Sequence, residues 1–323
     1  MVLMVSRILP TLGPLHLIHP RYNAATLLEM AKEARPEVVL LASWPGVPSL
    51  EEEPALWALF AWAEAQGVPV EAVGTGGKEE AEAFREALKA FPQGEAYLAR
   101  IAEWEKGLSE LLSAPLTPGR LGEEGFVEGL RAHLEALAQA FGEGPATGHR
   151  RRRMEEAARR LSGEPRRALV LVEVLDYPYL LPAFPEARPL DRSPTEAERE
   201  RALLDRAWLL REEDDWGALL EGLFQIGTPE ALFLAGQIYL AAGQPEEALE
   251  VFEEVFRTDF QDPPYLPGYF LARFGQLLDH FGQRERAQRA YRGVLALSFA
   301  PEEARAIALA GLRTPFRLGE TPV

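Results

Sequence analysis

The apolar positions in the first half of the chain form three short β-branched runs separated by two helical patterns. The runs cover residues 2–10, 37–43 and 68–74. Residues 23–34 and 51–66 lie between them and repeat their apolar side chains at helical spacing. Alternating strands and helices of these lengths predict a parallel sheet with right-handed crossovers.

A long helical section and a fourth strand follow. The helical pattern runs from residue 78 to about residue 161, with breaks predicted at 92–94 and 115–125. The apolar run 168–174 then predicts a strand that returns to the same sheet. Five prolines between Pro178 and Pro194 then predict irregular structure. The expected division is an α/β domain at residues 1–181, a linker at 182–194 and a helical domain at 195–323.

From Thr195 onward the pattern is helical, and two stretches share one spacing of small and aromatic residues. Thr195 and Glu198 are placed as a helix-capping pair. Within residues 229–260 the spacing has offsets of 3, 4, 5 and 4 and involves Gly236, Tyr239, Gly243, Ala248 and Phe252. Within residues 268–297 it recurs as Gly275, Leu278, Gly282, Ala287 and Tyr291.

This spacing resembles the tetratricopeptide repeat, a unit of about 34 residues whose two helices cross closely at small residues. One such unit cannot bury its own apolar face. We therefore expect residues 201–227 to supply a degenerate first unit and residues 301–312 a capping helix. The expected fold class is an α/β domain with a mainly parallel sheet, followed by an all-α domain of tetratricopeptide-like helical hairpins.

Stacked hairpins of this kind form a concave groove that binds an extended peptide or a partner helix. On the first helices of the two units, Phe233, Gln237 and Gln276 are expected to face the groove. Their apolar and amide side chains predict a peptide that is selected by apolar contacts. Helices that merely cover the α/β domain are the alternative.

Composition restricts the possible functions. A chain of 323 residues is long enough for two domains, and the absence of cysteine excludes disulfides, thiolate metal sites and a cysteine nucleophile. With 34 basic and 50 acidic residues, the net charge of −16 disfavours nucleic acid and anionic membranes as partners. Without a signal-peptide pattern or an apolar run of about 18 residues, we expect a cytoplasmic protein. The preference for arginine over lysine indicates a GC-rich, thermophilic bacterial origin.

The first half also carries a series of motifs. Gly13-Pro-Leu-His16 follows the first strand, residues 36–42 read Pro-Glu-Val-Val-Leu-Leu-Ala, Arg153 lies on a late helix, and Glu173 and Asp176 follow the fourth strand. In order and spacing these segments resemble the superfamily that includes the TraB-type pheromone-shutdown proteins, the erythromycin esterases and the haem-uptake protein ChaN. The resemblance implies a hydrolase-like, metal-assisted site at the strand ends that contains His16, Arg153, Glu173 and Asp176.

Four positions depart from the family pattern. Met154 replaces a polar residue, and Glu173 stands where the family has a glycine. Ala42 stands where the family has an acid, and Asp176 stands where it has a histidine. We therefore interpret the site as degenerate, non-catalytic and without a cofactor, and His16 as a turn histidine bonded to the backbone. The alternative is a metal-assisted hydrolase that uses His16 with Glu173 and Asp176. In that alternative, His16, His19 and Asp176 would hold a divalent ion such as zinc or manganese.

Two further segments suggest anion binding. The loop 74–78 (Gly-Thr-Gly-Gly-Lys) is not a Walker A motif, because Ala72 and Glu79 occupy two of its required positions. The run 149–153 (His-Arg-Arg-Arg-Arg) is expected to be a solvated helix start, with a receptor for a small anion as the alternative. The sequence as a whole favours a non-catalytic interaction protein that binds a protein or peptide through its C-terminal repeats.

Overall fold

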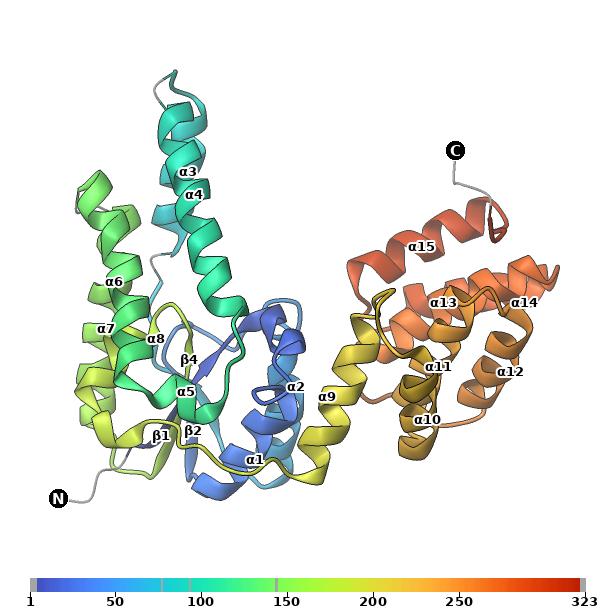
Figure 1. Cartoon of the computed structure of the whole chain (residues 1–323), viewed down its shortest axis with the longest axis horizontal. Coiled ribbons are helices and arrows are strands. Elements are labelled where there is room, and N and C mark those ends of the chain that lie inside the picture. Colours follow the sequence, from blue (N-terminus) through green and yellow to red (C-terminus); the bar gives the residue numbers. More distant parts are fainter. Residues whose placement is uncertain (1–4, 77, 93, 143–144, 320–323) are drawn as a thin grey trace. The chain divides into compact units, whose positions relative to one another are not determined.

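The computed structural model describes residues 5–76, 78–92, 94–142 and 145–319. The predicted strand at 2–10 and the loop at 74–78 lie partly outside these ranges. The chain divides into two compact units, Met1–Arg201 and Ala202–Val323, each with an apolar core of its own. The first unit is built around a parallel sheet and the second is helical (Figure 1). The predicted order of an α/β part and an all-helical part is confirmed.

In the described part of the first unit, four strands form one parallel sheet. They are β1 (Val5–Thr11), β2 (Val38–Leu41), β3 (Val70–Ala72) and β4 (Ala168–Glu173). Their order is β1-β4-β2-β3, so the fourth strand returns to the sheet as predicted and lies between the first two. Thr11 pairs with Glu173, and Leu41 pairs with Leu171 and Ala72. The carboxyl ends of the strands therefore meet at one edge of the sheet.

The inner position of β4 follows from its composition. Residues 168–172 (Ala-Leu-Val-Leu-Val) are completely buried, as expected of a parallel strand that is covered on both faces. Glu71 and Ala72 of β3 are exposed, which suits a strand at the border of the sheet. The alternation of polarity that would mark a half-exposed strand is absent from β4 for this reason.

Both helices predicted between the first three strands are present. In α1 (Ala24–Ala34), the N-cap Asn23 accepts a hydrogen bond on Oδ1 from the N–H of Thr26 at 3.1 Å. Thr26 Oγ1 accepts in return from the N–H of Asn23 at 3.2 Å, so both groups are satisfied reciprocally. The second helix begins later than predicted, because Pro54 opens a 3-10 turn (Pro54–Leu56) before α2 (Trp57–Ala65).

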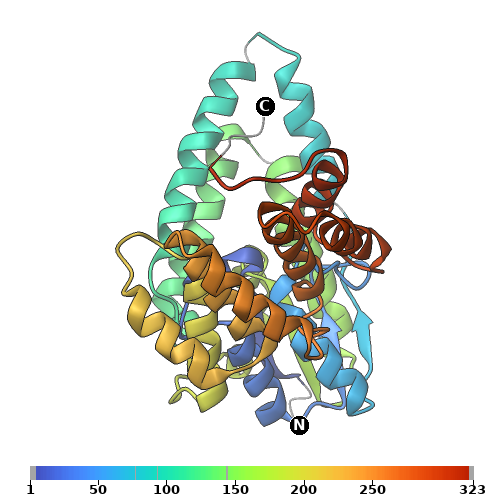
Figure 2. The same ribbon diagram turned by 90° about the vertical axis from the view of Figure 1, so that its right-hand side faces the viewer.

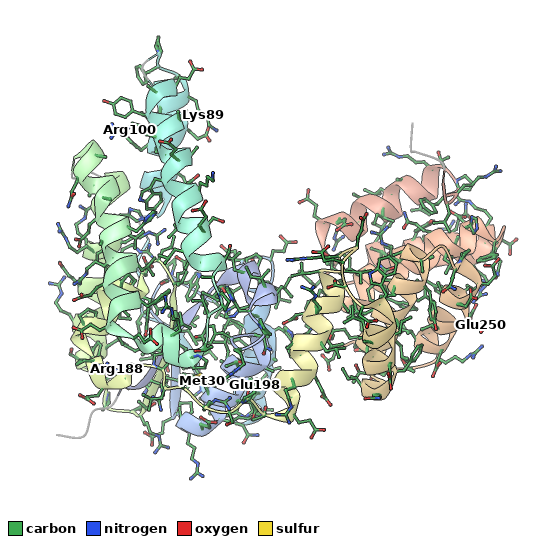
Figure 3. All side chains as sticks on the ribbon, viewed as in Figure 1. Met30, Lys89, Arg100, Arg188, Glu198 and Glu250 are labelled. Atoms are coloured by element: carbon green, nitrogen blue, oxygen red, sulfur yellow. The ribbon has the colours of Figure 1, made fainter. Side chains whose placement is uncertain are left out.

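The helical section between β3 and β4 is divided near both predicted breaks, and it divides once more after Phe141. Its helices are α3 (Lys78–Lys89), α4 (Gly94–Ser113), α5 (Pro118–Gly122), α6 (Glu124–Phe141) and α7 (Pro145–Ser162). α3 and α4 form a hairpin that extends beyond the sheet (Figures 1 and 2). Lys89 and Arg100 lie toward its outer end (Figure 3). α6 and α7 lie on the side of the sheet opposite α1 and α2 (Figure 1).

The segment predicted to be an irregular linker, residues 182–194, is partly folded. After α8 (Tyr177–Leu180), the chain makes two 3-10 turns, Leu181–Ala183 and Pro185–Ala187. Phe184 and Ala187 are buried in the core of the first unit. The prolines restrict the backbone to tight turns, but the apolar residues between them still anchor the segment to the α/β unit.

The second unit is a series of helices that pack in sequence order. It begins within α9 (Glu196–Trp208), because the first unit ends at Arg201. The helices that follow are α10 (Trp216–Ile226), α11 (Pro229–Ala241), α12 (Pro245–Phe256), α13 (Leu266–His280), α14 (Arg284–Ala296) and α15 (Glu302–Arg313). Consecutive helices from α10 to α15 pack against one another. The predicted cap of α9 is present, because Glu198 Oε2 accepts from the N–H of Thr195 at 2.7 Å and Thr195 Oγ1 accepts from the N–H of Glu198 at 3.3 Å.

Close approach at glycines explains the repeated spacing. A Cβ atom on Gly236 of α11 would overlap the ring of Phe252 of α12, and one on Gly275 of α13 would overlap the ring of Tyr291 of α14. The same ring of Tyr291 lies against Gly311 of α15. Each aromatic side chain therefore packs directly on the backbone of its neighbour, which only glycine permits.

Replacing Gly236 with alanine should destabilise the second unit, because the new methyl group must displace the buried ring of Phe252. Overpacking of this kind costs about 1–3 kcal/mol. We expect a matching decrease in the free energy of unfolding, measured by chemical denaturation followed by circular dichroism. Gly217→Ala in α10, where the added methyl group has ordinary clearance, is the matched control. Equal stability of the two variants would contradict the close-packed helix pair.

Candidate functional site

At the carboxyl edge of the sheet, the fold gathers the polar residues that the resemblance singled out. Glu173 ends β4, and Asp176 follows it within one turn. Ser43 lies just after β2, and α7 contributes Arg150 and Arg153. We refer to these five residues as the carboxyl-edge cluster. Proteins with parallel sheets usually bind their ligands at the carboxyl edge, which is where the resemblance predicted a site.

Asp176 is the centre of the carboxyl-edge cluster and is completely buried. Its Oδ1 accepts a hydrogen bond from Nη1 of Arg150 at 2.9 Å, and its Oδ2 lies 3.1 Å from Nη2 of Arg153. Nη1 of Arg150 also lies 3.7 Å from Oε2 of Glu173. Arg153 donates to the carbonyl oxygen of Ser43, and Ser43 Oγ accepts from the N–H of Glu173 at 2.9 Å. The cluster therefore ties β4 and the end of β2 to α7.

The chemistry of the cluster is that of a structural ion network. Two guanidinium groups face two carboxylates, so the charges balance. Asp176 has no exposed surface, and both of its oxygens face arginines, so it cannot approach a substrate. Nε and Nη1 of Arg153 are buried without a hydrogen-bond partner among the described residues, and so is Oδ2 of Asp176, which meets Arg153 only as an ion pair. A buried water molecule can satisfy donors of this kind.

His16 does not belong to this cluster. The ring lies at the end of the 3-10 turn Gly13–Ile18 and is 3% exposed. Its Nδ1–H donates to the carbonyl oxygen of Tyr22 at 2.8 Å, and its Nε2 accepts from the N–H of Leu12 at 3.0 Å. Burial lowers the pKa of His16 from 6.5 to about 4, so the ring is neutral at pH 7. His16 is therefore a turn histidine whose ring is bonded to the backbone, as we expected from the sequence.

His19 is held in the same way. Its Nε2–H donates to the carbonyl oxygen of Leu112 at 2.8 Å, and its Nδ1 lies 3.4 Å from the N–H of Leu116, which donates to it. Burial lowers its pKa as well. Both ring nitrogens of each histidine are thus engaged with the backbone, and Asp176 is engaged with arginines. The described residues contain no group of three or more His, Asp or Glu that could hold a metal ion. The combination of His16, His19 and Asp176 is not formed.

The basic run 149–153 differs from its prediction. Arg151 and Arg152 are exposed, as expected of a solvated helix, but Arg153 is buried and Arg150 is half-buried. Helical geometry causes the difference, because residues three apart share one face of α7 and this face covers Asp176. In the loop at 74–78, Gly74 packs closely against the backbone of Ala42 and Trp44, whereas Gly77 lies outside the described residues.

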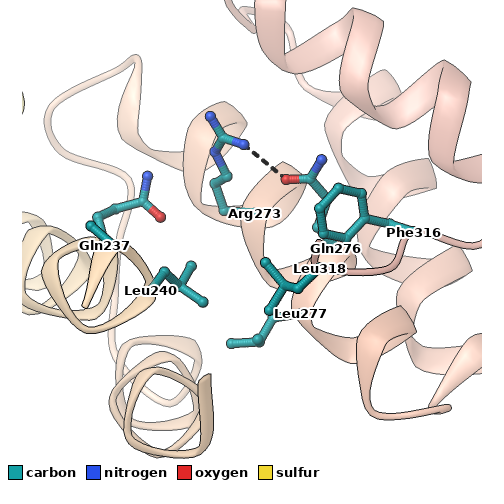
Figure 4. A pocket seen from close by; sticks show the side chains of 8 residues that line it. Gln237, Leu240, Arg273, Gln276, Leu277, Phe316 and Leu318 are labelled. Atoms are coloured by element: carbon teal, nitrogen blue, oxygen red, sulfur yellow. Dashed lines mark hydrogen bonds between the residues drawn. The ribbon is translucent and has the colours of Figure 1, made fainter. Parts of the chain in front are cut away.

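The second unit contains a cavity of about 240 Å³ between α11 and α13. The lining residues are Gln237, Leu240 and Ala241 of α11, Arg273, Gln276 and Leu277 of α13, and Phe316 and Leu318 of the segment after α15. Figure 4 shows these side chains around the opening, which we call the groove. The Oε1 atom of Gln237 is buried and has no hydrogen-bond partner among the described residues. Nη1 of Arg273 donates to Oε1 of Gln276 at 3.0 Å.

Two of the three predicted groove residues line the groove, and one does not. Gln237 and Gln276 are in its wall. Phe233 is completely buried, and its ring centroid lies 5.7 Å from that of Phe252 and 5.6 Å from that of Trp208. The prediction for Phe233 is therefore wrong. α11 is apolar around most of its circumference, so periodicity does not distinguish its groove side from its core side.

Several groove residues were missed by the sequence reasoning. Leu240 lies three positions after Gln237, and Arg273 lies three positions before Gln276, so helical spacing from the two glutamines could have found them. Phe316 and Leu318 follow the last helix, where no periodic signal exists. Only the folded chain brings them to the groove.

The helix pair α11–α12 is similar to a known repeat family. Residues 229–262 match the family model described as Tetratricopeptide repeat. The match includes the whole of α11 and α12 and confirms the repeat predicted at 229–260. No curated protein and no solved structure matches this chain. The resemblance of the first half to the TraB, erythromycin-esterase and ChaN superfamily therefore has no support from these comparisons.

In the ranges that the structure describes, no helix combines the length and the apolar character needed to cross a lipid bilayer.

The buried histidines should make stability depend on pH. Because the pKa of His16 in the folded chain is about 4 and its ordinary value is 6.5, the unfolded chain binds more protons between these values. The contribution of His16 is complete above pH 6.5 and decreases as the pH falls toward 4. We expect a loss of about 2 kcal/mol in the free energy of unfolding between pH 7 and pH 5.

Chemical denaturation at the two pH values measures this loss. His16→Gln should reduce the dependence on pH by about that amount, and His133→Gln, at a half-buried histidine of the same unit, controls for the loss of an imidazole. If the free energy of unfolding of His16→Gln depends on pH as strongly as that of the parent chain, His16 is not buried in its neutral form.

Removing the carboxylate of Asp176 should destabilise the first unit strongly. Asp176→Asn leaves the buried guanidinium of Arg153 without a countercharge, and breaking a buried pair in this way costs about 3–5 kcal/mol. The matched control is Asp191→Asn, which removes an exposed ion pair at 3.6 Å from Arg21 and should change stability by less than about 1 kcal/mol. If both variants unfold like the parent chain, the carboxyl-edge cluster is not structural.

Proposed function

We propose that this protein is a non-catalytic interaction protein whose helical repeats bind an extended peptide segment of a partner protein. The tetratricopeptide match at residues 229–262 supports an interaction role. The observation that carries the proposal further is the groove between α11 and α13, with its buried and unpaired acceptor on Gln237.

The buried Oε1 of Gln237 indicates what the groove binds. A buried acceptor without a donor is costly, and a ligand that donates a hydrogen bond removes this cost. The N–H groups of an extended peptide are such donors, because they are not used within the peptide itself. Gln276 presents a second amide on the facing helix. Amides on two neighbouring helices therefore suit a peptide backbone better than a charged ligand.

The remaining wall selects side chains. Leu240, Ala241 and Leu277 give the groove an apolar surface, and Arg273 adds a charge that is already oriented by Gln276. A partner peptide with apolar side chains toward the helices satisfies this surface. Helix-in-groove and extended-peptide binding both use such alternating anchors.

In this proposal, the α/β unit is catalytically silent and requires no cofactor. Its carboxyl edge is closed by the pairing of Asp176 with Arg150 and Arg153, and the nitrogens of His16 and His19 are engaged with the backbone. Descent from a hydrolase remains a hypothesis that rests on the motif resemblance alone. A metal-assisted hydrolase built on His16, Glu173 and Asp176 is disfavoured by the same engaged atoms.

Selection of peptides from a displayed library on the immobilised full chain tests the proposal. Leu240→Arg places a long cation in the apolar wall and should weaken the binding of a selected peptide by about tenfold or more, a change of at least about 1.4 kcal/mol. Fluorescence anisotropy measures the dissociation constant. Leu309→Arg, at an exposed leucine of α15 outside the groove, should have no effect. Peptides that bind Leu240→Arg as well as the parent chain would refute binding in the groove.

A further inference from the structure

The chain after α15 turns back to the groove that we propose for the partner. Phe316 and Leu318 line the same cavity as the side chains of α11 and α13. Figure 4 shows Phe316 and Leu318 among the side chains that line the groove together with Gln276 and Leu277. Residues 314–319, which we call the tail, therefore supply an aromatic and an aliphatic side chain to the groove, two positions apart.

A buried carboxylate anchors the tail. The N–H of Phe316 donates to Oδ2 of Asp279 at 3.1 Å. Asp279 is buried and is oriented by Arg284, whose Nη1 donates to its two oxygens at 2.9 and 2.8 Å, and by the hydroxyl of Tyr291 at 3.0 Å. Nη2 of Arg284 also donates to the carbonyl oxygen of Leu312 at the end of α15. The site for a peptide N–H thus exists in the framework of the repeats, independently of the tail.

The tail is held lightly compared with the helices. Phe316 is half-buried, Leu318 is 38% exposed, and Pro315, Arg317 and Gly319 are exposed. Segments with few buried apolar contacts open at low free-energy cost. The tail can therefore leave the groove without unfolding the repeats.

We propose that the tail is a resident ligand of the groove, and that the partner is a peptide with the same chemistry: an extended segment with an aromatic and an aliphatic residue two positions apart. Side chains at positions i and i+2 of an extended chain point to the same side, so both reach the helices together. This inference rests on the proposed function. It adds the sequence class of the partner and a competitor built into the chain.

The covalent link between the tail and α15 determines how strongly the tail competes with a partner peptide. A ligand attached by a short flexible link acts at an effective concentration of about a millimolar, so even a weak segment occupies its site for much of the time. The apparent affinity for a partner decreases by the fraction of molecules with an open groove. If the tail is docked in about nine of ten molecules, its removal should tighten partner binding about tenfold.

The experiment compares two forms of the full chain with one probe. The probe is a fluorescently labelled peptide of residues 314–319, Thr-Pro-Phe-Arg-Leu-Gly. The double variant Phe316→Ala/Leu318→Ala should bind the probe about tenfold more tightly than the parent chain. Leu309→Ala, which also shortens a leucine but on the exposed side of α15, should bind it like the parent. A probe with alanine in place of its phenylalanine and leucine should bind neither form.

The outcomes separate this inference from the proposed function. If the probe binds the parent chain and the double variant with equal affinity, the tail is not a ligand of the groove. A probe that binds neither form, while a library-selected peptide binds both, would also overturn it and would leave the groove as a peptide site. Failure of every peptide to bind either form would overturn the proposed function itself. Circular dichroism establishes that the double variant is folded, and a chain ending at Thr314 serves as a second form with an open groove.

Discussion

The second unit depends on the direct packing of an aromatic ring against a glycine of the preceding helix. Phe252 lies against Gly236, and Tyr291 lies against Gly275. This contact brings two helices closer than any side chain would allow, so that each pair exposes a continuous apolar face to the next pair. Phe270 and Phe274 fill that face between the pairs, with ring centroids 5.6 and 6.4 Å from Phe252. Stacking of hairpins therefore follows from the contact within each hairpin.

In the first unit, a buried charge has the corresponding role. Asp176 lies where a parallel sheet usually opens toward a ligand, and it has two arginines as partners instead. A carboxylate without solvent is tolerated only if its charge is balanced, and two guanidinium groups balance the charge of Asp176. Arg150 and Arg153 meet this requirement by pairing with Asp176, whereas a hydrolytic site would need such side chains to face a substrate. The arrangement that stabilises the carboxyl edge is thus the same arrangement that argues against chemistry there.

The periodicity of apolar residues predicted those parts of the molecule whose structure follows from one requirement, either the burial of a strand or the close contact of two helices. The buried runs at 37–43 and 168–174 became inner strands, and the glycine–aromatic spacing located the hairpins. The burial of Phe233 was missed, because a helix covered on most sides has no polar face to reveal its orientation. The linker was missed in part, because Phe184 is anchored between prolines. The pairing of Arg153 with Asp176 depends on the distance between α7 and β4, which no local pattern records.

The groove can be traced to the glycine contact as well. Gln237 and Gln276 each follow a close-contact glycine by one residue, so they occupy equivalent positions in the two hairpins. A turn of about 100° per residue carries them away from the buried aromatic ring and toward the opening between α11 and α13. Two equivalent amides therefore line the same opening, and the side chains of the tail line it as well. The contact that holds each hairpin together therefore also determines which face of its first helix lines the groove.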